Sequence, residues 1–274
     1  MTRHLKKICA SLLLMVAGVA QAAPDADLWP RWAAHDDASK QTIDASAWDA
    51  VLHDIVKSSP DGINRIAYGK VSAANRARLD GFVQRMQAVV ISQYSRAEQR
   101  AYWINLYNAE TVKLVLEHYP VESILKINIS PGLFARGPWD KPLLKVEGQM
   151  LTLNDIEHRI LRPIWRDPRT HYAVNCASLG CPNLADRAWS AEAMEPMLDA
   201  AARAFINHPR GAQVRDGKLV TSSIYKWFRA DFGGSDAGVI AHLRKYAAPP
   251  LAAQLAGIRK IDDDQYNWEL NDLR

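Results

Sequence analysis

The chain has 274 residues, of which 48% are hydrophobic and 23% charged. This is enough apolar sequence for one large or two small cores, and it excludes a disordered or low-complexity protein. The formal net charge is +4, and the first seven residues hold three of the positive charges. The remainder is close to neutral and has no run of Lys or Arg, so nucleic acid is not expected as a partner.

Residues 1–22 read as a secretory signal. A basic start precedes an apolar run from Ile8 to Ala20, and Ala20-Gln21-Ala22 fits the pattern of small residues at a cleavage site. The alternative is a short N-terminal membrane anchor, although the run is shorter than the roughly 20 residues of a membrane span. We therefore expect an exported protein, periplasmic or secreted, with no transmembrane anchor after cleavage.

The first part of the expected mature chain is a polar arm over residues 23–45. Trp29 and Trp32 in this arm indicate that it is held against the body of the protein. Helices are predicted over residues 45–57 and 72–92, where apolar residues recur at helical spacing. We interpret residues 46–274 as a single domain.

A capping box, Ser95-Arg-Ala-Glu98, starts a helix that runs to about residue 118. Asn108 lies in the middle of its apolar face, and Asn105 flanks that face. A buried amide without partners costs roughly 1–3 kcal/mol. Asn108 therefore either brackets the backbone of a loop or lines a site.

A hairpin is predicted around Glu147-Gly148, and Thr152 is expected to cap the short helix that follows. Glu157 lies at the centre of the apolar stripe of this helix, and His158 lies at its flank. A buried carboxylate requires compensation. Glu157 is either paired with an arginine (Arg162, Arg166 or Arg169) or belongs to a site.

The segment from Asp167 to Leu184 carries both cysteines of the expected mature chain, Cys176 and Cys181. A strand is predicted from His171 to Cys176, followed by a Ser-Leu-Gly turn. Downstream we expect a helix over 190–207, a hairpin over 214–220, three short helices and a last strand over 266–270. This pattern predicts an α+β fold, mostly helical, with a small and mainly antiparallel sheet.

Three interpretations of the cysteines remain open. In the first interpretation Cys176 is a nucleophile with a histidine base, His171 or His158. Its orienting residue is drawn from Glu157, Asn108 and Asn175. In the second interpretation Cys176 and Cys181 form a disulfide, which suits an exported protein. In the third they bind a metal with a histidine, although zinc sites usually use closer cysteine spacing.

The predicted strand weakens the first interpretation. Alternate residues of a strand point to opposite faces, so His171 and Cys176 lie on different sides of a straight strand. A bend at Asn175-Cys176, or His158 as the base, would restore the pair. Export, the cysteine pair and the polar helix face are equally compatible with a non-catalytic factor.

Several ordered motifs together resemble the family known as domain of unknown function 547. They extend from about residue 60 to the C-terminus, and they are Tyr102–Ala109, Leu153–His158, Asp167–Cys176, Cys181-Pro182, Trp227–Gly233 and Tyr266–Asn271. The last departs from the pattern, since an Asp is expected where Asn267 stands.

This resemblance implies a compact domain of exported bacterial proteins and of some eukaryotic multidomain proteins, with no assigned activity. It also groups six characteristic polar residues: Asn105, Asn108, Glu157, His171, Asn175 and Cys176. A relation to papain-like or transglutaminase-like enzymes is an analogy at the level of fold, and a cysteine on a strand does not match their usual cysteine on a helix.

The leading hypothesis is a cysteine/histidine-dependent hydrolase or acyl-transfer enzyme on peptide or cell-envelope amide bonds. Its catalytic residues would be Cys176, His171, Glu157 and His158, with Asn105, Asn108 and Asn175 binding or orienting the substrate. The alternative is a periplasmic binding or assembly factor with a Cys176–Cys181 disulfide. No cofactor or metal is expected. The sequence identifies no partner, and an envelope peptide or protein would be the substrate under the leading hypothesis.

Overall fold

The computed structural model describes residues 24–132 and 135–273. The expected signal at residues 1–22 therefore lies outside the described residues. Nearly half of the chain, 46%, is helical, and the sheets are small. The predicted class, a mostly helical α+β fold, is confirmed.

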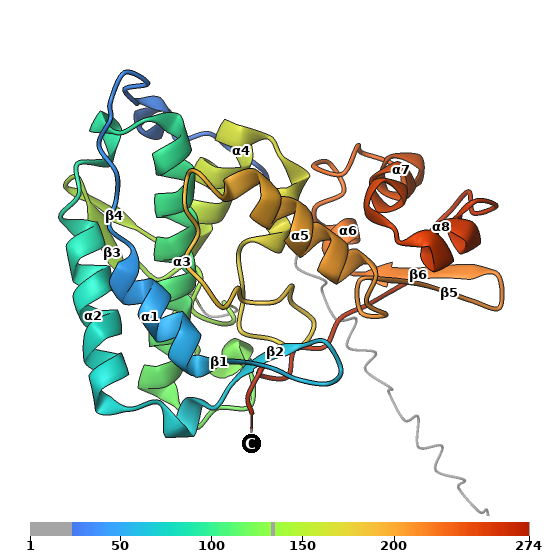
Figure 1. Ribbon diagram of the computed structural model, residues 1–274, viewed down its shortest axis with the longest axis horizontal. Coiled ribbons are helices and arrows are strands. Elements are labelled where there is room, and N and C mark those ends of the chain that lie inside the picture. Colours follow the sequence, from blue (N-terminus) through green and yellow to red (C-terminus); the bar gives the residue numbers. More distant parts are fainter. Residues whose placement is uncertain (1–23, 133–134, 274) are drawn as a thin grey trace, which may run out of the picture.

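Three helices form one side of the molecule (Figure 1): α1 (Ser46–Ile55), α2 (Ala73–Gln87) and α3 (Arg96–His118). The Ser95 hydroxyl caps α3 by accepting a hydrogen bond from the Glu98 N–H at 3.4 Å. The Glu98 carboxylate does not close the capping box, because it accepts from the Ile43 N–H at 3.1 Å. Ser95 thus caps the helix while Glu98 ties down the N-terminal arm.

Helix α3 is buried around nearly its whole circumference. From Gln99 to Val112 every residue is buried, which is typical of a helix at the centre of a domain. Trp32 of the N-terminal arm packs edge-on against Trp103 of α3, with ring centroids 5.1 Å apart. The backbone N–H and carbonyl groups of loops that reach this helix must therefore form hydrogen bonds with its polar side chains.

Two hairpins and a π-helical segment accompany these helices, and the π-helical segment packs against α3. The hairpins are β1 (Val56–Ser58) with β2 (Asn64–Ile66), and β3 (Leu144–Val146) with β4 (Gln149–Leu151). The β3–β4 turn falls at Glu147-Gly148, as predicted. The predicted short helix is π-helical over Asp155–Leu161 and continues as α4 (Arg162–Trp165). Such π-helical segments are frequently found at functional sites.

The C-terminal part extends from the middle of the molecule to its other end (Figure 1). Its helices are α5 (Met194–Ile206), α6 (Ile224–Trp227), α7 (Asp236–Tyr246) and α8 (Pro249–Leu255). Its sheet holds β5 (Ala212–Arg215), β6 (Lys218–Ser222) and β7 (Asp263–Gln265), with β7 parallel to β6. Short 3-10 helices complete the chain at Pro30–Ala33, Tyr68–Lys70, Ile91–Gln93, Ile124–Lys126 and Pro168–Tyr172.

Two of the predicted strands are wrong. The segment from His171 to Cys176 is the end of the 3-10 helix Pro168–Tyr172 followed by an irregular turn. The last strand is β7, Asp263–Gln265, and residues 266–270 run irregularly beside the cysteine segment. In both places α3 or the cysteine segment supplies the hydrogen bonds that a neighbouring strand was expected to supply.

The cysteine segment lies where two hydrophobic clusters meet. The Tyr172 side chain packs in the cluster of the C-terminal part, whereas Ala173, Val174 and Ala177 pack in the cluster around α1–α3. The chain therefore crosses from one cluster to the other between Tyr172 and Ala173. Side chains on the two sides of this crossing face different surroundings.

Candidate functional site

Asn108 fixes the turn of the cysteine segment. Its Nδ2 donates to the Ala173 carbonyl at 2.8 Å, and its Oδ1 accepts from the Asn175 N–H at 2.8 Å. One amide of the central helix thus replaces two ladder bonds of a strand. This explains why an alternating, strand-like sequence forms a turn here.

Asn105 and Asn175 act in the same way. Asn105 holds both the N–H and the carbonyl of Trp189, at 2.9 and 2.8 Å. Asn175 donates to the Pro182 carbonyl at 2.7 Å and accepts from the Ala177 N–H at 2.8 Å. Both ends of each amide are bonded to main chain, so we assign these asparagines to shaping the loop. Their predicted contact with substrate stays a prediction.

The two cysteines form what we call the thiol site, together with Ser178 and Tyr266. The Sγ atoms of Cys176 and Cys181 are 2.9 Å apart and both thiols are free. A disulfide bond would measure about 2.05 Å. The Cys176 Sγ also lies 2.9 Å from the Tyr266 hydroxyl and 3.3 Å from the Ser178 hydroxyl. Cys176 is half-buried and Cys181 is buried.

The surroundings shift the pKa values of the two thiols in opposite directions. Burial by itself raises the pKa of Cys176, but hydrogen bonding with Cys181, Ser178 and Tyr266 outweighs it and the net pKa is lowered. Burial raises the pKa of Cys181 well above its ordinary value, and the bond to Cys176 raises it further. Cys176 is therefore the thiol that ionises first.

The backbone of the thiol site is constrained on both sides. Ala177 has a φ of +56°, a left-handed conformation that is uncommon for a residue other than glycine. The terminal segment is hydrogen-bonded across it, from the Leu179 N–H to the Glu269 carbonyl and from the Gly180 N–H to the Asn267 carbonyl, each at 2.8 Å. Strain of this kind often accompanies functional sites.

Gly180 is required by this packing. A Cβ at position 180 would lie 2.7 Å from the Asn267 backbone nitrogen and 2.9 Å from its carbonyl oxygen. The close approach brings Tyr266 over the cysteines, where its ring also packs against Trp227 and Trp268 at centroid distances of 4.8 and 4.6 Å. The Ser-Leu-Gly turn thus positions the Tyr266 hydroxyl on the Cys176 thiol.

A second polar group surrounds His171, and we call it the histidine cluster. The His171 Nε2 lies 2.7 Å from Asp231 Oδ2, and its Nδ1 lies 3.7 Å from Glu157 Oε1. The imidazole stacks on the Phe228 ring with centroids 4.2 Å apart. Both ring nitrogens of His171 therefore face carboxylates.

Glu157 is held differently from the sequence-based alternative of an arginine pair. Tyr107 of α3 donates its hydroxyl proton to Glu157 Oε2 at 3.0 Å, and the other oxygen faces His171. Arg162 instead pairs with Asp231, its Nε lying 2.6 Å from Oδ2. Arg169 binds Asp167, and Arg166 makes no ion pair within the described ranges.

His158 is a buried neutral acceptor. Burial lowers its pKa to about 4, and the nearby Arg162 lowers it as well, against the opposing charge of Glu157. Its Nδ1 lies 3.0 Å from an Arg162 nitrogen. In the part of the chain that the structure describes, the bonded partners of the Cys176 thiol are Ser178, Cys181 and Tyr266, and none is a histidine.

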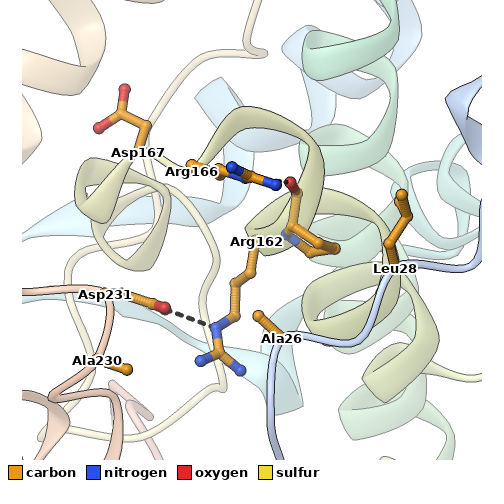
Figure 2. Close-up of a pocket in the computed structure, with 8 residues that line it drawn as sticks. Ala26, Leu28, Arg162, Arg166, Asp167, Ala230 and Asp231 are labelled. Atoms are coloured by element: carbon orange, nitrogen blue, oxygen red, sulfur yellow. Dashed lines mark hydrogen bonds and ion pairs between the residues drawn. The ribbon is translucent and has the colours of Figure 1, made fainter.

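A cavity of about 430 Å³ opens beside the histidine cluster (Figure 2). Its lining residues are Ala26, Leu28, Arg162, Pro163, Arg166, Asp167, Ala230 and Asp231. The Arg162–Asp231 ion pair is part of the cavity wall (Figure 2). Asp231 also bonds the imidazole of His171, which is not among the lining residues. A concave site with a few converging polar groups is the usual form of a small-molecule site.

Several residues of these sites were not predicted, among them Asp231, Tyr266, Ser178 and Tyr107. Asp231 and Tyr266 lie inside motifs that were noted for the family, but their partners come from 60 and 90 residues away. Ser178 lies in the predicted turn. Polar or aromatic residues within the family motifs were the available signal, since spacing alone does not reveal such distant pairs.

No group of three or more His, Cys, Asp and Glu side chains among the described residues is arranged to hold a metal ion. In the same residues, no helix has the length and apolar character needed to cross a bilayer.

The fold and the thiol site define a mostly helical α+β protein with paired free cysteines on a constrained turn. Residues 91–206, which include α3, the histidine-bearing helices and both cysteines, match the family model described as "Protein of unknown function, DUF547". The resemblance predicted from the sequence is confirmed over this range. No curated protein and no solved structure matches the chain.

Proposed function

We propose that this protein is an exported thiol–disulfide exchange protein in which Cys176 reacts with the substrate and Cys181 is its partner thiol. The observation that supports the proposal most is the 2.9 Å separation of the two Sγ atoms, one from the half-buried residue Cys176 and one from the buried residue Cys181. Export would place the pair in the periplasm or outside the cell, where cysteine pairs become oxidised.

The reaction transfers the Cys176–Cys181 disulfide to a substrate with two thiols. A substrate thiolate attacks the Sγ of Cys176, the less buried of the two residues. The Cys176–Cys181 bond breaks, and Cys181 leaves as a thiolate that takes up a proton. The second substrate thiolate attacks the substrate sulfur of the mixed disulfide. The bond from that sulfur to Cys176 breaks, and Cys176 leaves as a thiolate. The substrate gains a disulfide, and the protein gains two electrons and two protons. Another disulfide compound reoxidises the pair.

The lowered pKa of Cys176 supports this direction. A thiol of low pKa is a good leaving group, and stabilising the thiolate stabilises the reduced form of the pair. The Ser178 and Tyr266 hydroxyls supply that stabilisation. A structural disulfide has no need of such donors.

The test uses the oxidised protein and a peptide that carries two cysteines, followed by mass spectrometry. The wild-type protein should oxidise the peptide. Cys181→Ser, supplied as a mixed disulfide with a small thiol, should accumulate a Cys176–peptide adduct when the peptide keeps only one of its two cysteines, because no second thiol then releases Cys176. Cys176→Ser should form no adduct. A wild-type disulfide that stays inert to the peptide would instead support the non-catalytic binding or assembly factor.

A second candidate is the hydrolase or acyl-transfer enzyme on peptide or envelope amide bonds. The strained Ala177 beside an acidic thiol favours it. Since His171 is held between two carboxylates, Tyr266 rather than a histidine would pass the proton to the leaving amine. This candidate needs Cys176 alone. Cleavage of an envelope peptide that survives Cys181→Ser and is lost in Cys176→Ser would support it.

A further inference from the structure

The cavity beside the histidine cluster has charges of both signs on its wall. Arg162 and Arg166 are positive, Asp167 and Asp231 are negative, and the rest of the lining is apolar. Asp167 is fully engaged, since Arg100 and Arg169 both bond its carboxylate. What the cavity offers a ligand is therefore decided by the other charged groups.

Asp231 has one oxygen available. Its Oδ2 accepts hydrogen bonds from both Arg162 Nε and His171 Nε2, at 2.6 and 2.7 Å. Its Oδ1 accepts no hydrogen bond from any residue in the described ranges. The carboxyl is ionised near neutral pH: burial opposes ionisation, but bonds from His171 and Arg162 lower its pKa to about 2. Asp231 Oδ1 is thus an acceptor for a cation or an N–H group.

Arg166 supplies the opposite charge. Its Nε donates to the Pro163 carbonyl at 3.4 Å, and within residues 24–132 and 135–273 its two terminal nitrogens have no partner. The residue has a left-handed backbone, φ +49°, at the end of α4. Figure 2 shows Arg166 on the wall of the cavity. A guanidinium fork binds a carboxylate with two parallel hydrogen bonds.

We propose that this cavity binds a small zwitterion, an α-amino acid with an apolar side chain. Its ammonium group would donate to Asp231 Oδ1 and its carboxylate would accept from Arg166. Ala26, Leu28 and Pro163 form the apolar wall for the side chain. A dianion would face the carboxylates of Asp167 and Asp231, and a simple cation would face two arginines, so a ligand with both charges matches the wall best.

The size of the cavity agrees with this ligand. Its volume of about 430 Å³ lies within the range of small-molecule sites, roughly 300–1,000 Å³. The N-terminal arm closes one wall, because the Asp27 and Trp29 N–H groups donate to the His158 and Arg159 carbonyls at 3.1 and 3.0 Å. The test therefore uses the whole mature chain with this arm.

Calorimetric titration with three related probes tests the proposal: L-leucine, its methyl ester and N-acetyl-L-leucine. The ester lacks the carboxylate and the acetyl compound lacks the ammonium group. We expect saturable binding of leucine and at least tenfold weaker binding of both analogues. Arg166→Ala should weaken leucine binding at least tenfold, whereas Arg187→Ala, an exposed arginine outside the cavity wall, should leave it unchanged.

Absence of saturable leucine binding to the folded wild-type protein would overturn the proposal. Equal binding of the ester or the acetyl compound would do so as well, and so would an unchanged affinity in Arg166→Ala. Arg166 is exposed, so this variant should fold, and its circular dichroism spectrum checks that. The inference does not depend on the thiol chemistry, because Cys176 does not line the cavity. Cys176→Ser should therefore bind leucine like the wild-type protein.

Discussion

His171 of the histidine cluster and Cys176 of the thiol site lie five residues apart in the sequence, yet the two sites are built in opposite ways. In the histidine cluster, Asp231 is compensated by Arg162 and His171. In the thiol site, the Cys176 thiol has hydroxyl and thiol partners only. The difference shows that a cysteine and a histidine in one motif need not form a catalytic pair.

Asn108 is the physical cause of this separation. It binds Ala173 and Asn175 and turns the chain between the two groups. Tyr172 packs in one hydrophobic cluster and Ala173 in the other. His171 is thereby directed to the cavity side and Cys176 to the terminal segment.

The largest expected effect is a loss of exchange activity when the thiol site is mutated but not when the histidine cluster is mutated. Cys181→Ser should reduce multiple-turnover oxidation of a dithiol peptide by at least 100-fold, because the protein disulfide is no longer formed. His171→Ala should change that rate by less than about threefold after correction for folded fraction. A large loss in His171→Ala, measured in the same peptide assay, would join the two regions into one catalytic site.

The second prediction concerns the turn between the regions. Asn108→Ala should lower the free energy of unfolding by about 3 kcal/mol, since it leaves a buried carbonyl and a buried N–H without partners. Urea unfolding measures this. Asn105→Ala is the matched control, because it removes two similar bonds at Trp189. Both variants should be destabilised, but only Asn108→Ala should change the alkylation rate of Cys176.

The third prediction compares the compensated carboxylates with one that is poorly compensated. Burial raises the pKa of Glu110 on α3 to about 7, and Lys113, 3.9 Å away, opposes this only in part. A folded-state pKa above the unfolded value means that the folded protein binds more protons. The Glu110 contribution to stability is therefore present below about pH 4.5 and is lost as pH rises toward 7.

Glu110→Gln tests this contribution. The variant should be more stable than the wild-type protein by on the order of 2 kcal/mol at pH 8, and the difference should shrink toward zero near pH 4.5. Urea unfolding at several pH values gives the difference. Glu192→Gln, at an exposed glutamate, should show no such trend. A pH-independent difference would contradict the assignment.

The smallest expected effect concerns the thiol. Tyr266→Phe removes a hydroxyl 2.9 Å from the Cys176 Sγ and should raise the Cys176 pKa. Its alkylation rate by iodoacetamide at pH 7 should fall about threefold, while the rate at pH 10 should be unchanged. Tyr172→Phe is the control, since its hydroxyl bonds Tyr225 and His242 instead. An equal rate at pH 7 would show that Tyr266 does not stabilise the thiolate.

Much of the fold was predictable because its signals are local. The Ser95 cap, the turn at Glu147-Gly148 and the hairpin over 214–220 are set by neighbouring residues, and each is present. The burial of Glu157 was also predicted from helical spacing and is confirmed, with the exposed fraction of this residue at 7%.

The rest depends on contacts between distant residues. The run from His171 to Cys176 alternates like a strand, but Asn108, more than 60 residues earlier, satisfies its backbone. The Asp231–His171 and Tyr266–Cys176 contacts span 60 and 90 residues. Local periodicity carries no information on such pairs, so the candidate residues were identifiable while their grouping was not.

The reduction potential of the Cys176–Cys181 pair tests the central claim most directly. The mature protein is equilibrated in glutathione buffers of graded potential, alkylated, and its two redox forms are quantified by mass. Exchange function predicts a midpoint between about −120 and −270 mV, the range of catalytic pairs. A midpoint below about −300 mV would mark a structural disulfide and contradict the proposed function.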